Sequence, residues 1–262
     1  MRPVVGSRDH VTTPGGLLSF AQPPRIAVIG ASGGIGGALV SSLSAGVPSA
    51  TILALSRNGT QPADTEVVTG IIDIEQEESI AGAAALAQDE LGRLDLAIVA
   101  TGLLHDGDAM TPEKSWWALD GASMERAFRI NAIGPALVAK HFLPLLASDT
   151  KSVFASLSAR VGSIEDNRLG GWYAYRASKA ALNMMIKSLS IELERRNPKA
   201  ICVGLHPGTV DTGLSKPFQS NVPEGKLFTP DHAAGALLSV IDGLGEKDTG
   251  RVFAWDGQPI PY

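Results

Sequence analysis

From residue 25 to its end, the chain alternates strand-like and helix-like segments. Runs rich in apolar and β-branched residues occur at 25–29, 51–55, 66–72, 94–100, 152–157, 200–205 and 251–254. Several are apolar throughout, as in strands that are covered on both faces. Segments with helical periodicity lie between them, at 36–45, 76–91, 123–146, 173–195 and 231–244. This order predicts a single α/β domain: a doubly wound, seven-stranded parallel sheet with helices on both faces.

Composition narrows the classes of partner. The formal net charge is −5 and 19% of residues are charged, so no basic field points to nucleic acid or an anionic membrane. Apolar runs are far shorter than the roughly 18 residues of a membrane span. Cys202 is the single cysteine, which excludes an internal disulfide and fits a reducing, cytoplasmic location. The histidines lack metal-binding spacing, so we expect no catalytic metal.

Residues 1–24 differ from the rest of the chain. They contain Gly15-Gly16 and Pro23-Pro24 but no compact apolar stretch. A signal peptide would need a basic start and an apolar stretch of about 7–15 residues. We therefore expect a flexible N-terminal extension at 1–24, or a wrongly assigned start codon, and one domain at 25–262.

Glycines cluster between the first strand and the first helix. The sequence there is Gly30-Ala-Ser-Gly-Gly-Ile-Gly-Gly37, a spacing that departs from the usual Gly-x-Gly-x-x-Gly. Glycine permits positive φ and lets the backbone approach a pyrophosphate, while the helix N-terminus supplies free N–H groups. The position predicts a dinucleotide-binding loop rather than a plain tight turn. Its contacts would come from Gly30, Ser32, Gly33, Gly34, Ile35 and Gly36.

The residues after the second strand indicate which dinucleotide binds. NAD-binding folds usually place a carboxylate there, which holds the ribose 2′-hydroxyl. This strand ends in Leu55-Ser56-Arg57-Asn58, without a carboxylate. An arginine can pair with a 2′-phosphate and a serine can add a hydrogen bond. We therefore expect NADP(H) rather than NAD(H), the alternative being a solvated Arg57.

Tyr175 and Lys179 are spaced for acid–base chemistry. Residues four apart lie on one face of a helix, so the phenol and the ammonium would share one space. A nearby cation favours phenolate and lowers the pKa of a tyrosine from about 10. Such a tyrosine can give a proton to a carbonyl or take one from an alcohol. By itself the spacing is also typical of a solvated helix face.

Six pieces of the sequence carry a resemblance to one family. They are the 30–36 loop, Asp73-Ile74, Ala100-Thr101-Gly102, Asn131, Tyr175-x-x-x-Lys179, and Pro207-Gly208-Thr-Val210-x-Thr212. Over residues 25–262 the chain resembles the short-chain dehydrogenase/reductase family. It looks most similar to the branch of the C-factor and sniffer-type carbonyl reductases. The resemblance implies a Rossmann-type fold.

The resemblance also implies roles. Tyr175 would be the acid/base, Lys179 would lower its pKa and bind the nicotinamide ribose, and a serine would hold the substrate oxygen. Asn131 would anchor a water that links Lys179 to solvent. The sequence supports this, because Pro135 has no N–H to donate to the carbonyl four residues earlier; a kinked core helix explains the same residues. The implied cofactor contacts are Asp73, Ile74, Ala100, Thr101, Gly102, Tyr175, Lys179, Pro207, Gly208, Val210 and Thr212.

The identity of the serine is less direct. Counting back from Gly162, an ungapped match to the family places Ala159 at the serine position. Ser158 is our choice, although it needs a shift of one residue in the turn. Ser156 and Ser163 are poorer candidates.

Other segments receive simpler interpretations. Glu113 is expected to be a solvated loop charge. Trp116-Trp117 would either line a substrate pocket or close the edge of the core. Residues 211–229 contain Pro217, Pro223 and Gly225 and few periodic apolar positions, which is typical of a lid over a substrate.

Together these observations predict an NADP(H)-dependent oxidoreductase that transfers hydride between nicotinamide and a carbonyl or secondary-alcohol substrate. Two alternatives stay open. One is a cofactor-binding signalling protein of the C-factor kind, with slow or incidental redox activity. The other is an epimerase or dehydratase that retains its nicotinamide. The segments 123–146 and 173–195 carry more apolar positions than one sheet face requires, so we expect a homodimer or homotetramer.

Overall fold

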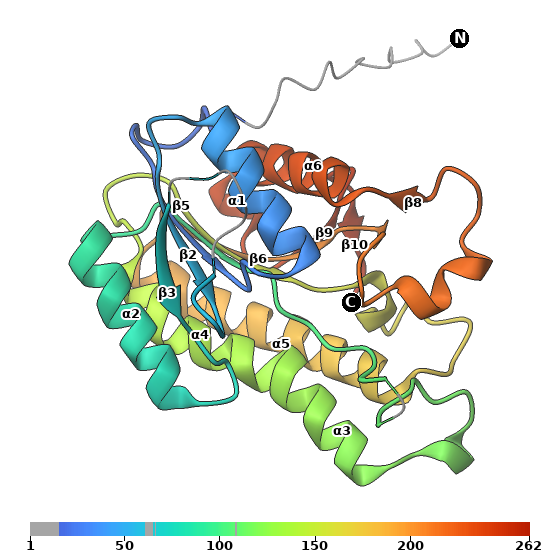
Figure 1. Cartoon of the computed structure of the whole chain (residues 1–262). Coiled ribbons are helices and arrows are strands. Elements are labelled where there is room, and N and C mark those ends of the chain that lie inside the picture. The colour runs from blue at the N-terminus through green and yellow to red at the C-terminus, as the bar shows by residue number, and fades with distance from the viewer. Residues whose placement is uncertain (1–15, 61–64, 66, 108) are drawn as a thin grey trace, which may run out of the picture.

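The computed structural model describes residues 16–60, 65, 67–107 and 109–262. An eight-stranded sheet of order β10-β9-β6-β5-β4-β1-β2-β3 forms its centre (Figure 1). Neighbouring strands are parallel except for the pair β9 and β10. The strands are β1 Arg25–Ile29, β2 Thr51–Ser56, β3 Val68–Ile71, β4 Leu96–Val99, β5 Ser152–Leu157, β6 Ala200–His206, β9 Val252–Ala254 and β10 Pro259–Ile260. The doubly wound fold predicted from the alternating pattern is confirmed.

Helices cover both faces of the sheet. Figure 1 shows α1 and α6 on one face and α2, α4 and α5 on the other. The bounds are α1 Gly34–Gly46, α2 Glu77–Leu91, α4 Gly134–Phe142, α5 Tyr173–Arg196 and α6 Pro230–Gly243. The strand order reverses between β1 and β4, because β2 and β3 lie on one side of β1 and β4 to β6 lie on the other.

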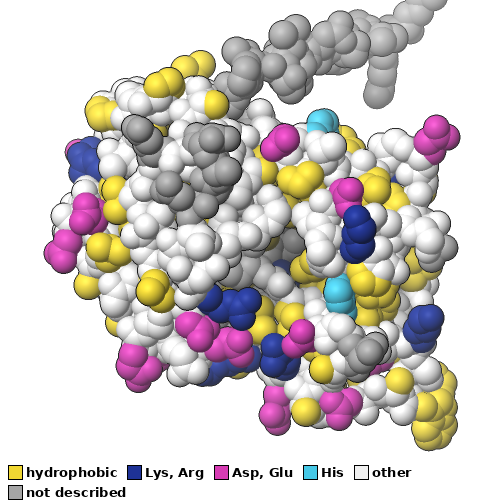
Figure 2. Space-filling model, viewed as in Figure 1, with side chains coloured by type: hydrophobic (Ala, Val, Ile, Leu, Met, Phe, Trp, Pro, Cys, Tyr) yellow, Lys and Arg dark blue, Asp and Glu magenta, His cyan; other side chains and the backbone are white. Residues whose placement is uncertain are grey.

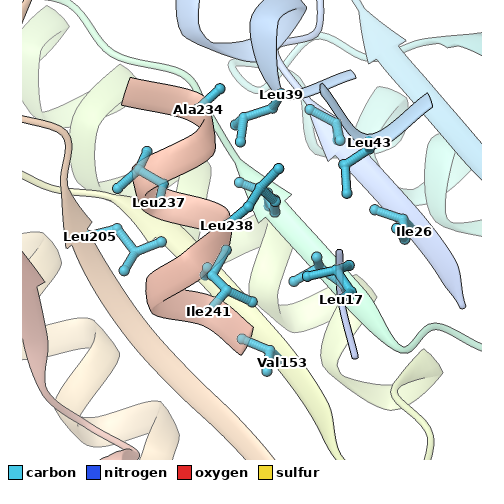
Figure 3. Packing of buried hydrophobic residues seen from close by; sticks show 14 of the residues in the cluster. Leu17, Ile26, Leu39, Leu43, Val153, Leu205, Ala234, Leu237, Leu238 and Ile241 are labelled. Carbon is cyan, nitrogen blue, oxygen red and sulfur yellow. The ribbon is translucent and has the colours of Figure 1, made fainter. Parts of the chain in front are cut away.

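Each face has its own apolar core. Leu39 of α1 and Leu237 and Ile241 of α6 pack against the sheet, where they meet Ile26 and Leu205 (Figure 3). Full burial of a leucine or isoleucine side chain stabilises the fold by roughly 1.5–3 kcal/mol. These layers hold the strands rigidly, and the strands in turn set the positions of the loops at their carboxyl ends.

The predicted helix at 123–146 is divided into four parts. In the structure this segment consists of α3 Gly121–Phe128, a π-helical turn at Arg129–Ile133, the helix α4, and a 3₁₀ turn at Leu143–Leu145. Pro135, at the start of α4, cannot donate a backbone hydrogen bond, which breaks the α-helical ladder at this point. Gly134 is needed beside it, because a Cβ there would lie 2.9 Å from the carbonyl oxygen of Ile74.

The prediction of seven strands is wrong by one. β10 pairs antiparallel with β9 through the turn at residues 255–258, where Gly257 has φ 77°. Asp256-Gly257 is a strong hairpin signal, and a hairpin returns the chain antiparallel. β10 has only two residues, too short for a periodic pattern to reveal it.

The boundary at residue 24 is also wrong in part. Residues 1–15 lie outside the described residues, but Leu17 and Phe20 are buried in the core cluster that contains residues of α1 and α6. Figure 3 shows Leu17 in this cluster. Ser19 binds Asp242, and Lys151 Nζ donates to the carbonyl oxygens of Ile241 and Asp242 at 3.0 and 2.8 Å. The folded domain therefore begins before β1.

The segment 211–229 is folded. Its ends are tied by the parallel pair β7 Thr209–Val210 and β8 Leu227–Phe228, and it contains the 3₁₀ helix Lys216–Asn221. Further 3₁₀ turns lie at Trp116–Ala118, Arg160–Gly162 and Glu246–Asp248. Within the described parts of the chain, no helix combines the length and apolar character needed to cross a membrane.

Candidate functional site

A cavity of ≈ 580 Å³ lies at the carboxyl ends of the central strands. Its walls come from the loops after β1, β4, β5 and β6, from α5 and from the 211–229 segment. Figure 2 shows this face hollowed near its middle, with hydrophobic side chains gathered beside the hollow. Ligands of open α/β sheets bind where the strand order reverses, which is where this cavity lies.

The glycine loop has the geometry of a phosphate-binding turn. Gly30 has φ 90°, in the left-handed region that favours glycine. A Cβ on Gly36 would lie 2.1 Å from the carbonyl oxygen of Gly30, so the loop and α1 can approach this closely only with glycine. The N-terminus of α1 begins at Gly34 after Gly33, whose lack of a side chain leaves the first helical N–H groups free of a side-chain cap. Gly33, Gly34 and Ile35 line the cavity, so these groups face it.

Two polar atoms in the cavity wall have no hydrogen-bond partner among the described residues. They are Thr101 Oγ1 and His206 Nδ1, both buried. Burial, aided by the charge of Arg160, lowers the pKa of His206 to about 4, so the ring is neutral at physiological pH. Buried polar groups are rarely left unpaired, so each is a place where a bound polar molecule would be held. The glycine loop, the N-terminus of α1 and these two unpaired atoms together fit a bound dinucleotide.

Tyr175 and Lys179 both line the cavity from α5. Lys179 Nζ lies 5.9 Å from the centroid of the Tyr175 ring and donates to the carbonyl oxygen of Leu157 at 2.8 Å. Burial raises the pKa of Tyr175 to about 12 and lowers the pKa of Lys179 to about 7. The expected lowering of the Tyr175 pKa is thus wrong for this arrangement, because desolvation outweighs an ammonium that itself loses charge near neutral pH. At neutral pH the phenol is protonated and suited to donate.

Asn131 lies outside the cavity wall but braces it. Its Oδ1 accepts from the Leu103 N–H at 2.8 Å, and its Nδ2 donates to the Leu103 carbonyl at 2.7 Å and to Ser178 Oγ at 3.1 Å. These bonds tie the loop after β4 to α5. A Cβ on Gly102 would lie 3.6 Å from Asn131 Oδ1 and 3.7 Å from Lys179 Nζ, so the three groups meet at one point.

Ser158 lines the cavity, but its hydroxyl is engaged elsewhere. Ser158 Oγ donates to Asn183 Oδ1 at 2.6 Å. Ala159, the next residue, also lines the cavity and packs in one apolar cluster with Tyr175 and Leu104. Of the poorer candidates, Ser156 is buried in β5 and Ser163 accepts from the Asp166 N–H.

Several predicted cofactor residues lie away from the cavity wall. Ser56 is buried and donates to Asn58 Oδ1, and Arg57 is exposed. Asp73 accepts from the Glu75 N–H through Oδ1. Gly30, Ser32, Gly36 and Ile74 do not line the cavity either. The predicted residues that do line it are Gly33, Gly34, Ile35, Ala100, Thr101, Gly102, Ser158, Tyr175, Lys179, Pro207, Gly208, Val210 and Thr212.

The apolar part of the cavity was largely missed by the sequence analysis. It is formed by side chains from three separate loops and from the last residue of β5, which no local pattern connects. Only the expected lid at 211–229 anticipated some of them. The residues are Leu104, Leu157, Val161, Trp172, Leu214, Phe218 and Val222.

Trp172 precedes α5 in an unusual conformation. Its φ is 51°, and it follows Gly170 and Gly171, which have φ 62° and 64°. The Trp172 ring meets the Tyr175 ring edge-on at 6.3 Å and the Phe218 ring at 5.1 Å. A left-handed conformation costs a non-glycine residue about 1–2 kcal/mol, so neighbouring contacts must hold it in place.

Glu113 supplies one of those contacts, because its backbone carbonyl accepts from the Trp172 N–H at 2.6 Å. The prediction of a solvated charge at Glu113 is wrong. The residue is only 5% exposed, and both carboxylate oxygens accept from the Ala174 N–H. The Trp116-Trp117 prediction is wrong as well. These rings are exposed and belong to neither the cavity wall nor the core.

Comparisons with known proteins agree with this geometry. Residues 24–223 match the family model for short chain dehydrogenases. The chain is 41% identical over 150 residues to C-signal of Myxococcus xanthus, covering 56% of this chain and 85% of that protein. It is 32% identical over 186 residues to a 1-hydroxy-2-glutathionyl-2-methyl-3-butene dehydrogenase of Rhodococcus sp. (strain AD45), covering 71% and 76%.

Solved structures extend the likeness to the whole fold. An NADPH-bound carbonyl reductase from chicken fatty liver superposes with a TM-score of 0.79 at 27% identity, covering 95% of this chain and 98% of that one. The carbonyl reductase Sniffer of D. melanogaster gives a TM-score of 0.79 at 25% identity, covering 91% and 99%. The chain belongs to the short-chain dehydrogenase/reductase family of oxidoreductases.

Proposed function

We propose that this protein is an NADP(H)-dependent reductase of small carbonyl compounds, with Tyr175 as the proton donor. The observation that carries the proposal is the shared cavity. The glycine loop opens into it from one side, and Tyr175 and Lys179 enter it from α5. The chicken carbonyl reductase, whose structure contains NADPH, and the carbonyl reductase Sniffer have the same fold.

Different residues of the chain would bind the cofactor and transfer the proton. Gly33, Gly34 and Thr101 would hold the dinucleotide, which supplies the hydride when bound. Tyr175 would bind the substrate oxygen and give it a proton, because burial keeps the phenol protonated at neutral pH. Lys179, whose pKa of about 7 lets it change charge at neutral pH, would return a proton to Tyr175.

Asn131 would hold the two sides of the cavity in fixed positions relative to each other. Its side chain fastens the loop that carries Gly102 to α5, so the dinucleotide side and the acid/base side of the cavity cannot separate. We also propose that its backbone carbonyl binds a water that links Lys179 to solvent. Pro135 supports this, since it removes one backbone donor from that part of the helix.

The test is Tyr175→Phe, which removes the hydroxyl and keeps the ring. The variant should bind NADPH with unchanged affinity, measured by fluorescence, and should lose NADPH oxidation with a panel of aldehydes and ketones. Normal turnover in this variant would refute the assignment of the proton donor.

A second candidate is a signalling role with slow redox chemistry. Its support is the 41% identity to C-signal. If the Tyr175→Phe variant restores a biological output in cells that lack the protein, signalling does not need the redox reaction.

Three further proposals accompany this function. NADP(H) is preferred over NAD(H), because Arg57 follows β2 and is free in the described structure to meet a 2′-phosphate. The protein is a homodimer or homotetramer, for which Met184, Met185 and Ile191 offer an exposed apolar stripe on α5. Its location is cytoplasmic.

A further inference from the structure

The hydroxyl of Ser158 is directed away from Tyr175. Its acceptor, Asn183, lies eight residues beyond Tyr175 on α5, about 12 Å along the helix axis. Asn183 is itself held in place, since its Nδ2 contacts the Gly162 carbonyl at 3.4 Å. A serine has one proton to donate, and here Asn183 accepts it at 2.6 Å. Ser158 therefore joins β5 to α5 and has no proton left for a substrate oxygen.

The side chain that accompanies Tyr175 at the cavity is that of Ala159. It is 8% exposed, lines the cavity, and shares an apolar cluster with Tyr175 and Leu104. Val161, Leu214 and Phe218 pack against the same cluster. On this side of Tyr175 the neighbours are therefore apolar, and a methyl group stands where a second hydroxyl could have supported the substrate oxygen.

We propose that Tyr175 is the single hydroxyl that binds the substrate oxygen, that Ala159 rather than Ser158 faces that oxygen, and that the site therefore selects electron-poor carbonyl compounds. This inference rests on the proposed reductase function.

The chemical reason is the charge that develops on the substrate. As hydride adds to the carbonyl carbon, the C=O π pair moves onto oxygen, which takes the Tyr175 proton as the nicotinamide is oxidised. Each donor at a developing oxyanion changes rates by about 10²–10³-fold. With one donor fewer, more of the charge stays on the substrate, and electron-withdrawing groups on the carbonyl compound must carry it.

The test compares wild type with Ala159→Ser on para-substituted benzaldehydes and NADPH. In wild type the rate should rise steeply from the methoxy to the nitro compound. Ala159→Ser should raise the rate of reduction of the methoxy compound at least tenfold and that of the nitro compound only slightly. The dependence of the rate on the para substituent should therefore become less steep. Ala159→Cys is the matched control, because it adds similar bulk with only a weak S–H donor. Ser158→Ala should lose less than tenfold in rate.

A measurement without turnover checks the same contact. The carbonyl stretch of 4-methoxybenzaldehyde, bound with NADP⁺, should absorb at lower frequency in Ala159→Ser than in wild type, because the oxygen gains a hydrogen bond. Ala159→Cys should stay close to wild type.

The outcomes separate the inference from the function beneath it. An unchanged stretch and unchanged rates in Ala159→Ser, with a loss of over a hundredfold in Ser158→Ala, would overturn the inference and leave the reductase standing. NADPH that binds but is not oxidised by wild type or Ala159→Ser, with any of the aldehydes, would overturn the reductase and the inference with it.

Discussion

Glu113 caps α5 at Ala174, although 61 residues separate the two in the sequence. The carboxylate oxygens accept from the Ala174 N–H at 3.3 and 3.2 Å, and the Glu113 carbonyl accepts from the Trp172 N–H at 2.6 Å. A carboxylate is favoured at a helix N-terminus by the free N–H groups and the positive end of the dipole. The contact fixes the first turn of α5, which carries Tyr175.

Removing this cap should destabilise the protein. Glu113→Ala leaves a buried N–H unpaired, so we expect the free energy of unfolding to fall by about 1–3 kcal/mol in a urea titration. Glu113→Gln keeps an acceptor of the same shape. It should therefore recover at least half of the stability that Glu113→Ala loses. Equal stability of Glu113→Ala and wild type would show that the cap contributes nothing.

The contact between Gly36 and Gly30 should not tolerate a side chain. In Gly36→Ala the new Cβ would meet backbone, which cannot move aside as a side chain can. We expect at least a hundredfold loss of NADPH affinity by fluorescence titration, and about 1–3 kcal/mol of lost stability from overpacking. Gly82→Ala is the control: it lies in α2 with nothing within 4 Å of its Cβ, and alanine favours the helix. Tight NADPH binding by Gly36→Ala would rule out the loop as the phosphate site.

Lys179 should make stability depend on pH. Its pKa is about 7 in the folded protein and 10.5 as the ordinary value, so the unfolded chain binds more protons between these pH values. The free energy of unfolding therefore rises with pH above 7. Tyr175 and Cys202 have raised pKa values and act in the opposite direction, but only above their ordinary values of 10.0 and 9.0.

The window from pH 7 to about 9 excludes the opposing contributions of Tyr175 and Cys202. Urea titrations without nucleotide should show the rise in wild type and a smaller rise in Lys179→Met. Part of it should remain, because burial also lowers the pKa of Lys151. An identical slope in both proteins would contradict a buried, partly neutral Lys179.

Arg57 should discriminate between the two dinucleotides. It is exposed, and a charge-assisted bond to a 2′-phosphate contributes about 1.5–3 kcal/mol. Arg57→Ala should therefore weaken NADPH binding about 10–100-fold and leave NADH binding unchanged, with the NADPH effect shrinking at high salt. An equal effect on both dinucleotides would remove Arg57 from recognition of the 2′-phosphate.

Local sequence patterns predicted the bounds of an element correctly where the residues of that element alone show the pattern. β1 and β5 begin and end where their apolar runs do, and α5 begins at the predicted residue. A strand buried on both faces must be apolar along its length, and that constraint can be read directly. β10 was missed because two residues contain no period.

By itself, the sequence determined the order of strands and helices, the glycine loop after β1 and the spacing of Tyr175 and Lys179 on one helix face. These features depend on residues that are close together in the sequence and on the period of the helix. Only the tertiary structure decided that Glu113 caps α5, that Ser158 is bonded to Asn183, and that Ala159 stands beside Tyr175. Such contacts join residues far apart in the chain, and burial then shifts the pKa values of Tyr175 and Lys179 in directions that spacing cannot predict.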